Sequence, residues 1–269
     1  MPTIPPGGNQ PYRLRQVAES FGTDAERYDR TRPRYPDALV ERIVAAGPGP
    51  DLLDVGTGTG IAARQFQAAG CKVLGVEPDE RMAGLARHTG VECEVSTFET
   101  WDAAGRTFDT VTAGQTWHWV DPVAGAAKAA EVLRPGGRLA LFWNVFQLPP
   151  GLNEAFATAY REVLPEMPVN DPVMPAMEAY SVMFTQATDG MREAGAFSDP
   201  EQWHFGWEHS YTRDEWLDQV PTHGGSTRLP PAKLDELLSA IGAAIDARGG
   251  AFTMGYTAVV VTATRTATA

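Results

Sequence analysis

The chain has 269 residues, of which 43% are hydrophobic, enough for one large core and short for two domains of ordinary size. Its formal net charge of -12 and its short, acid-interrupted basic clusters make nucleic acid an unexpected partner, because a phosphate backbone would be repelled. The two cysteines, Cys71 and Cys93, lack the spacing of a disulfide framework or a metal site. No stretch approaches the roughly 20 apolar residues of a membrane span, and the N-terminal segment lacks the apolar region of a secretory signal. We therefore expect a cytoplasmic protein with no membrane partner and no metal, and the composition leaves its oligomeric state open.

The N-terminal segment combines a weak helical pattern with a proline-rich arm. Apolar residues recur at helical spacing at Leu14, Val17, Ala18 and Phe21, and "ERYDRTRPRYP" then interrupts the pattern with two prolines. We predict a short helix followed by an ordered arm. A second helix is predicted from Asp37 to Gly47, with an apolar stripe that would pack against a sheet.

Strands and helices then alternate along the chain. The predicted strands are "DLLDVG", "KVLGVE", "VECEVST", "FDTVTAG" and "GGRLALFWN". Helices are predicted from Gly60 to Ala69, from Asp79 to Arg87, and after Asp121, an N-cap residue followed by Pro122. Alternation at this spacing predicts an α/β fold with a doubly wound, mostly parallel sheet, helices on both faces and right-handed crossovers.

The pattern changes beyond Pro150. A Met- and Pro-rich stretch from Glu162 to Met191 is predicted to be a helical insertion. The segment "QWHFGWEHSY" alternates like a strand, and its aromatic face is expected to pack as sheet core; that face holds Trp203, Phe205, Trp207, His209 and Tyr211. A helix opened by Pro230-Pro231 and the final strand "AFTMGYTAVVVTATR" complete the predicted elements.

Three glycines on alternate positions, Gly56, Gly58 and Gly60, follow the first strand of this series. In an open α/β sheet this turn lies beyond the carboxyl ends of the strands, where ligands bind. A phosphate-binding P-loop is excluded because it needs a lysine in the motif, and the next lysine is Lys72. A dinucleotide fingerprint is disfavoured because Ile61 follows Gly60, so the pattern is GxGxG rather than GxGxxG.

Two acids flank the glycine turn. Asp54 lies at the end of a strand that should be buried, where an unpaired carboxylate is costly. Glu77 ends the next strand, and neighbouring strands lie about 4.8 Å apart, so its carboxylate could accept both hydroxyls of a ribose. Two acids without a base favour a cationic nucleoside that carries no phosphate. S-adenosylmethionine has this chemistry.

Four segments carry a family resemblance: "DVGTGTG", "VEPD", "FDTVTAGQTWHW" and "LRPGG". In this order they resemble the motifs of class I S-adenosylmethionine-dependent methyltransferases, in the ubiquinone-biosynthesis-like (type 11) branch that acts on small molecules. The resemblance is carried by about Ala25 to Asn144, and it implies a Rossmann-like, seven-stranded sheet with a helical lid or insertion. It further implies one domain over 1–269, divided into a lid arm (12–36), a cofactor-binding core (37–145), a helical substrate-side insertion (146–195) and final strands and helices (196–269).

The resemblance also implies roles for individual residues. The methionine part of the cofactor would be held by Asp54, Gly56, Thr57, Gly58 and Gly60, with Asp54 near its ammonium group, and Glu77 would hold the ribose. Pro78 and Met82 would lie against the adenine face, Phe98 and Glu99 at its edge, and Gln115 beside the sulfonium. Tyr28 and Arg32 resemble the lid that closes over the methionine carboxylate.

Methyl transfer is an in-line displacement, so most of the acceleration can come from alignment of the acceptor with the methyl group. If the acceptor is a hydroxyl or an acidic carbon, a base must take its proton, and His118 in "QTWHWVD" is the candidate. His118 could instead orient the substrate or pack between Trp117 and Trp119, which could shield the sulfonium or form the pocket wall. The other histidines, His88, His204, His209 and His223, have no comparable sequence context.

We expect the aromatic segment from Phe146 to Phe184 to roof the cleft and favour a small, largely apolar acceptor. The predicted function is methylation of a small molecule at oxygen, nitrogen or carbon, with S-adenosylhomocysteine as the second product. Two alternatives stay open: a relative that binds the nucleoside without methylating, and, less favoured, an NAD-dependent oxidoreductase.

Overall fold

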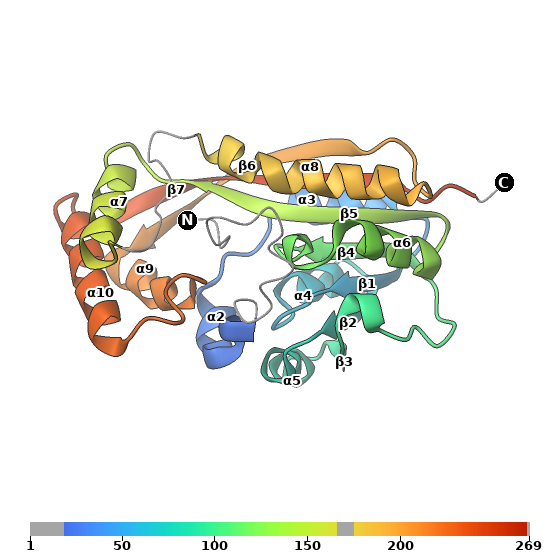
Figure 1. Cartoon of the computed structure of the whole chain (residues 1–269), viewed down its shortest axis with the longest axis horizontal. Coiled ribbons are helices and arrows are strands. Elements are labelled where there is room, and N and C mark those ends of the chain that lie inside the picture. The colour runs from blue at the N-terminus through green and yellow to red at the C-terminus, as the bar shows by residue number, and fades with distance from the viewer. Residues whose placement is uncertain (1–18, 166–174, 268–269) are drawn as a thin grey trace.

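The computed structural model describes residues 19–165 and 175–267 (Figure 1). Two parts of the predicted elements lie outside these residues. They are residues 12–18 of the lid arm, with Leu14, Val17 and Ala18 of its helical pattern, and residues 166–174 of the insertion.

The centre of the molecule is a seven-stranded sheet with the strand order β3-β2-β1-β4-β5-β7-β6. The strands are β1 (Asp51–Val55), β2 (Lys72–Glu77), β3 (Glu92–Val95), β4 (Phe108–Gly114), β5 (Leu133–Gln147), β6 (Glu201–Thr212) and β7 (Ala251–Thr264). Strands β1 to β5 pair in parallel, whereas β7 runs antiparallel to both β5 and β6. This topology confirms the predicted doubly wound, mostly parallel sheet.

Helices cover both faces of the sheet, as predicted. The α-helices are α2 (Ala25–Thr31), α3 (Asp37–Ala46), α4 (Ile61–Ala68), α5 (Glu80–His88), α6 (Pro122–Val132), α7 (Leu152–Val163), α8 (Ala176–Ala194), α9 (Arg213–Gln219) and α10 (Pro231–Asp246). Short 3₁₀ helices are η2 (Glu19–Asp24), η3 (Phe98–Thr100), η4 (Trp117–Trp119) and η5 (Val220–Thr222). Helices α3, α4 and α5 pack on one face, and α6 and α8 on the other. Among the described residues, no helix is both long and apolar enough to cross a membrane.

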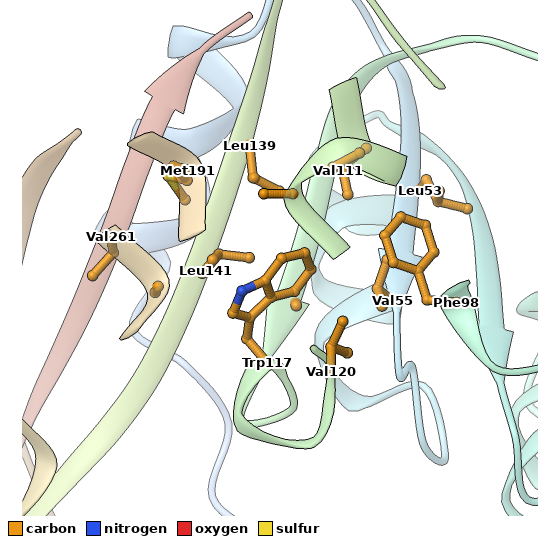
Figure 2. Close-up of a cluster of buried hydrophobic side chains, with 14 of the residues drawn as sticks. Leu53, Val55, Phe98, Val111, Trp117, Val120, Leu139, Leu141, Met191 and Val261 are labelled. Atoms are coloured by element: carbon orange, nitrogen blue, oxygen red, sulfur yellow. The ribbon is translucent and has the colours of Figure 1, made fainter. Parts of the chain in front are cut away.

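The face beneath α6 and α8 carries a large apolar core (Figure 2). Leu53, Val111, Leu141 and Val261 bring four different strands together there, and Trp117 from η4 lies among them. Because this core spans β1 to β7, it holds the carboxyl ends of the strands in fixed positions. Those ends carry the candidate site.

A third cluster joins α7, α9 and α10 at one end of the molecule, at the left in Figure 1. Strands β5, β6 and β7 are 15, 12 and 14 residues long and reach this cluster, whereas β1 to β4 have at most seven residues. Helix α2 lies between this end and α5 (Figure 1). The long strands therefore extend the sheet past the glycine turn and add a second wall to the site.

The N-terminal arm differs from its prediction, because its "ERYDRT" portion is helical and forms α2. The Asp24 side chain caps this helix by accepting a hydrogen bond from the Arg27 backbone amide at 3.0 Å. The helix ends at Thr31 because Pro33 disfavours helical geometry at the residue before it. The prolines thus end a helix at this point instead of preventing one.

The aromatic face predicted on β6 is less buried than expected. Trp203, Phe205 and Trp207 are half-buried, His209 is exposed, and Tyr211 is buried. Strand β6 is at the edge of the sheet, so helices cover this face only in part. Its aromatic residues therefore lie at the edge of the sheet and are only partly covered.

Candidate active site

One cavity opens at the carboxyl ends of the parallel strands, in agreement with the position predicted for the glycine turn. Its wall combines the turn after β1, the ends of β2 and β4, and residues of β5 and β7. Helices α2, α8 and α9, the short helices η2 and η4, and His223 directly after η5 supply further parts of the wall. The lining residues used below are Phe21, Tyr28, Arg32, Tyr35, Asp54, Gly56, Thr57, Gly58, Thr59, Glu77, Pro78, Met82, Gln115, Thr116, Trp119, Asn144, Phe146, Tyr180, Trp216, Gln219, His223 and Tyr256.

The glycine turn has the left-handed backbone that its composition predicts. Gly56, Gly58 and Gly60 have φ angles of 61°, 57° and 88°, which side chains other than hydrogen rarely allow. A Cβ on Gly56 would lie 2.0 Å from the Thr116 methyl group, so space also excludes a side chain there. Helix α4 begins directly after Gly60. The turn therefore presents backbone without side chains at the N-terminus of α4, which is suited to close contact with a ligand.

Asp54, the second-to-last residue of β1, lies in this cavity with only 2% of its surface exposed. Its two carboxylate oxygens accept hydrogen bonds from the hydroxyls of Thr57 and Thr112, both at 2.7 Å. Burial raises its pKa to about 6, against the two hydrogen bonds, which lower it. A cationic group in the cavity would stabilise the ionised form.

Glu77 ends β2 on the other side of the glycine turn and lines the same cavity. Its carboxylate accepts hydrogen bonds from the backbone amides of Gly58, at 2.9 Å, and Asp79, at 3.0 Å. These bonds fix the carboxylate against the turn. Burial outweighs them and raises the pKa of Glu77 to about 7.

Helix α2 brings the predicted lid residues Tyr28 and Arg32 to the cavity wall. The Arg32 guanidinium lies 4.7 Å from the centre of the Tyr28 ring, and its Nη2 donates to the Thr222 carbonyl at 2.5 Å. Asp29 on the same helix accepts from Thr59 in the glycine turn at 2.7 Å. Helix α2 is therefore attached both to the turn and to η5.

Pro78, Met82 and Gln115 also line the cavity, each at the end of a strand or at the start of the helix that follows. Gln115 has a left-handed φ of 55°, unusual for a residue with a side chain. Its backbone amide donates to the Phe142 carbonyl at 2.8 Å, which holds this turn against β5. The structure thus brings together ten of the thirteen predicted cofactor-binding residues, listed in full as Tyr28, Arg32, Asp54, Gly56, Thr57, Gly58, Glu77, Pro78, Met82 and Gln115.

The other three predicted cofactor-binding residues lie outside the cavity wall. Gly60 is set back as the residue before α4, although it belongs to the turn. Phe98 is 3% exposed and packs in the core of Figure 2, near Trp117. Glu99 accepts a hydrogen bond from the Asp121 backbone amide at 3.1 Å and so supports the start of α6. The η3 turn points Phe98 inward because an apolar ring is more stable in the core than in water.

His118 also lies behind the cavity wall. The base role predicted for it required a position facing the cleft, so the structure contradicts that expectation. The 3₁₀ turn of η4 places it in the interior, where its Nδ1 lies 3.4 Å from the indole nitrogen of Trp143. Burial lowers its pKa to about 3, so the ring is neutral at physiological pH and is a weak base. Its neighbour Trp119 does line the cavity. This environment favours the packing alternative for His118.

Several lining residues have no sequence signal that links them to the glycine turn. They are Tyr35, Asn144, Trp216, Gln219, His223 and Tyr256, whereas Phe146 and Tyr180 belong to the segment that was expected to roof the cleft. His223 lacked a distinctive context in the sequence, yet the fold places it in the wall beside Gln219, with 3.2 Å between their Nε2 atoms. The one available hint was the capping-box sequence of α9, Thr212 followed three residues later by Glu215, which could have predicted the helix but not its place.

Comparison with known proteins decides the family. A family model described as a methyltransferase domain matches residues 28–168, slightly more than half of the chain. The chain belongs to this methyltransferase family. The family uses S-adenosylmethionine, which is the cofactor predicted from the sequence.

The methyltransferase is 35% identical over 132 residues to an uncharacterized methyltransferase of Mycobacterium tuberculosis, an alignment that covers 48% of this chain and 54% of that protein. It is 31% identical over 157 residues to a demethylmenaquinone methyltransferase of Mycobacterium sp. (strain JLS), covering 55% of this chain and 66% of that protein. The chain thus spans about half to two thirds of the length of these relatives.

Solved structures support the same fold. A protein of Anaeromyxobacter dehalogenans described as a type II methyltransferase has a TM-score of 0.63 at 23% identity, covering 86% of this chain and 97% of that one. Phosphoethanolamine N-methyltransferase 2 of Haemonchus contortus has a TM-score of 0.53 at 16% identity, covering 97% of this chain and 61% of that one. The Rossmann-like methyltransferase fold of the chain is therefore confirmed.

Proposed function

We propose that the protein transfers a methyl group from S-adenosylmethionine to a small-molecule acceptor. The observation that carries this proposal is the pair of buried carboxylates, Asp54 and Glu77, on either side of a bare glycine turn in one cavity. Pyrophosphate would be repelled by both acids, whereas an ammonium group and ribose hydroxyls complement them. The cavity also offers one guanidinium, that of Arg32, for a carboxylate.

The side chains of the cavity suit the parts of this cofactor. Asp54, held by two threonine hydroxyls, would accept from the ammonium group, and Glu77 would accept from the ribose hydroxyls. Gly56, Thr57 and Gly58 would contact the methionine part through their backbone, and Gly60 would hold the turn in shape from behind. Pro78 and Met82 would cover the adenine, and Gln115 would lie beside the sulfur. When bound, the cofactor supplies an electrophilic methyl group.

We propose that residues 12–36 act as a lid arm over a cofactor-binding core at 37–145, with a substrate-side insertion at 146–195 and the final strands and helices at 196–269. The attachments of α2 to the glycine turn and to η5 support this division. Tyr28 and Arg32 would cover the methionine carboxylate and exclude water from the transfer. Phe98, Glu99 and His118 would act indirectly, through the core and the turns that carry the wall.

The acceptor would enter on the side of β5, β7 and α9, where the wall is rich in aromatic rings. The residues of the chain would bind and orient the acceptor so that its nucleophilic atom faces the methyl group, which is the main requirement of an in-line displacement. The name of the demethylmenaquinone methyltransferase relative is consistent with a ring-containing acceptor. A cytoplasmic location stays a prediction from the cysteine content.

Calorimetric titration tests the cofactor. We expect S-adenosylhomocysteine to bind, and NADH and ATP to give no heat of binding. The Asp54→Asn variant should bind S-adenosylhomocysteine at least about tenfold more weakly, because a charge-assisted hydrogen bond is lost. Binding of NADH alone would contradict the proposal and favour an oxidoreductase. Tight cofactor binding without a methylated product from any acceptor of a phenol and amine panel, read by mass spectrometry, would favour a non-methylating relative.

A further inference from the structure

The cavity has a second end, opposite Glu77. The strand order places β2 and β7 four strand spacings apart, or about 19 Å, and both strands contribute to the cavity wall. Glu77 marks the β2 end, and Tyr256 on β7 marks the other. A cavity of this span has room beyond the glycine turn for a second molecule.

The wall at the β7 end is rich in aromatic rings. The rings of Tyr180, Trp216 and Tyr256 line it, together with the neutral side chains of Gln219 and His223. Among the described lining residues, the charged ones are Asp54 and Glu77 at the glycine turn and Arg32, whose guanidinium bonds to Thr222, next to His223, at the β7 end. The rings make this end suited to an aromatic ligand.

Two polar atoms of this end are buried and lack a hydrogen-bond partner within the described part of the chain. They are the indole nitrogen of Trp216, a donor, and the Oε1 of Gln219, an acceptor. The two residues are three positions apart on α9 and so lie on one helix face. Buried polar groups are rarely left unpaired, and both of these residues line the cavity. A ligand is the natural partner for both atoms.

Neighbouring side chains hold these two groups in place. The amide nitrogen of Gln219 faces the Nε2 of His223 at 3.2 Å, which leaves its oxygen unpaired. The Trp216 ring packs edge-on against Tyr211 and Phe252, with ring centres 5.1 and 5.3 Å away. The Tyr256 hydroxyl at this end is paired, because it bonds to that of Tyr211 at 2.7 Å.

We propose that Trp216 and Gln219 bind a hydroxyl group on an aromatic acceptor. A hydroxyl is both a donor and an acceptor, so it can donate to the Gln219 oxygen and accept from the Trp216 nitrogen. The acceptor class is that of phenols and hydroxylated fused rings. His223 is a positioning residue that orients the Gln219 amide. This inference rests on the proposed function, because the site binds a methyl acceptor only if the protein transfers methyl groups.

Calorimetry with two ring compounds tests this site, using 2-naphthol and 2-methoxynaphthalene, which lacks the hydroxyl donor. We expect the full chain to bind 2-naphthol about tenfold more tightly, the effect of one hydrogen bond in a buried site. Gln219→Met keeps the bulk of the side chain and should remove most of this selectivity. Trp216→Phe removes the donor to the ring-bound oxygen that both compounds carry, so it should weaken both compounds by a similar factor. Gln202→Leu, a change of the same kind as Gln219→Met on exposed β6, should retain the selectivity.

His223→Phe should reduce the selectivity between the two naphthalenes while leaving the affinity for 2-methoxynaphthalene nearly unchanged, a result that a purely structural role would not give. All titrations are run with and without S-adenosylhomocysteine. Equal binding of the two compounds, or no binding of either, would overturn the inference and point to water at these atoms. Failure to bind S-adenosylhomocysteine would instead contradict the proposed function, because the selectivity is measured without it as well.

Discussion

Glu77 and Asp54 show how burial makes a single residue sensitive to pH. The pKa of Glu77 is raised to about 7 and that of Asp54 to about 6, both chiefly by loss of water contact. Each acid is therefore ionised only above its raised pKa, and it is the ionised form that accepts hydrogen bonds from a cationic nucleoside. Binding should be strongest above pH 7 and weaken as the pH falls.

We predict that the affinity for S-adenosylhomocysteine drops about tenfold between pH 8 and pH 6, the change in the ionised fraction of a group with a pKa near 7. Calorimetry across this range measures the drop. The Glu77→Gln variant should bind weakly, with a flatter profile, and Glu154→Gln, at an exposed position on α7, should behave as the unmodified chain does. An unmodified chain whose affinity is constant from pH 6 to 8 would refute the role of Glu77.

Gly56 carries the second prediction at this scale. Gly56→Ala would place a methyl group 2.0 Å from the Thr116 side chain on a backbone with φ of 61°, so the turn must shift. We expect loss of measurable cofactor binding by calorimetry. Gly70→Ala is the matched control, because its φ of 93° is equally strained but nothing lies within 4 Å of the added Cβ. That variant should cost stability of about 1 kcal/mol and keep binding; equal binding loss in both would contradict the contact argument.

At the scale of elements, α2 is a short helix whose position depends on contacts with distant segments. Asp29 accepts from Thr59 at 2.7 Å and from Arg64 at 2.6 Å, while Arg30 donates to Asp218 on α9 at 2.8 Å. A seven-residue helix is not stable alone, so these contacts decide whether it covers the cavity.

We predict that Asp29→Ala loosens α2 and speeds dissociation of S-adenosylhomocysteine several-fold, since its bonds to Thr59 in the glycine turn and to Arg64 on α4 are lost. Stopped-flow displacement measures the rate. Asp235→Ala on the exposed side of α10 is the control and should leave it unchanged. An Asp29→Ala rate equal to that of the unmodified chain would show that α2 does not retain the cofactor.

At the scale of the whole molecule, one cavity is lined by residues from Phe21 to Tyr256. A ligand there contacts both the parallel half of the sheet and the antiparallel extension, so binding should stabilise the fold as one unit. We predict that S-adenosylhomocysteine at a hundred times its Kd raises the free energy of unfolding by about 2.7 kcal/mol. Hydrogen exchange should show added protection in β1, α2 and α9 together. Protection confined to the glycine turn would contradict this coupling.

Much of the fold could be predicted because its signals are local. The strand and helix periods, the Asp121 cap and the alternate glycines each act within a few residues, and the structure has the expected elements there. Asp54 and Glu77 were found for the same reason, since each lies at or next to the end of a recognisable strand. Helix α2 was missed because its cap, Asp24, had to be weighed against two prolines that follow the helix.

Local sequence signals could not predict the direction in which side chains point inside short turns. His118 and Phe98 lie in 3₁₀ turns that follow strands. In such a turn, neighbouring residues point in different directions, so one side chain faces the cavity and the next faces the core. Burial of an aromatic ring or a neutral histidine in the apolar cluster outweighed the orientation expected from the motif.

The sequence by itself determined the alternating α/β pattern, the glycine turn and the two acids beside it. These features depend on local backbone geometry and on strands β1 and β2, which are consecutive in the chain and adjacent in the sheet. Only the tertiary structure decided the opposite wall, where Trp216, Gln219 and His223 face a turn more than 150 residues earlier in the chain. Their place depends on the antiparallel return of β7 and on the packing of α9 against it. Such long-range packing leaves no local pattern in the residues that it brings together.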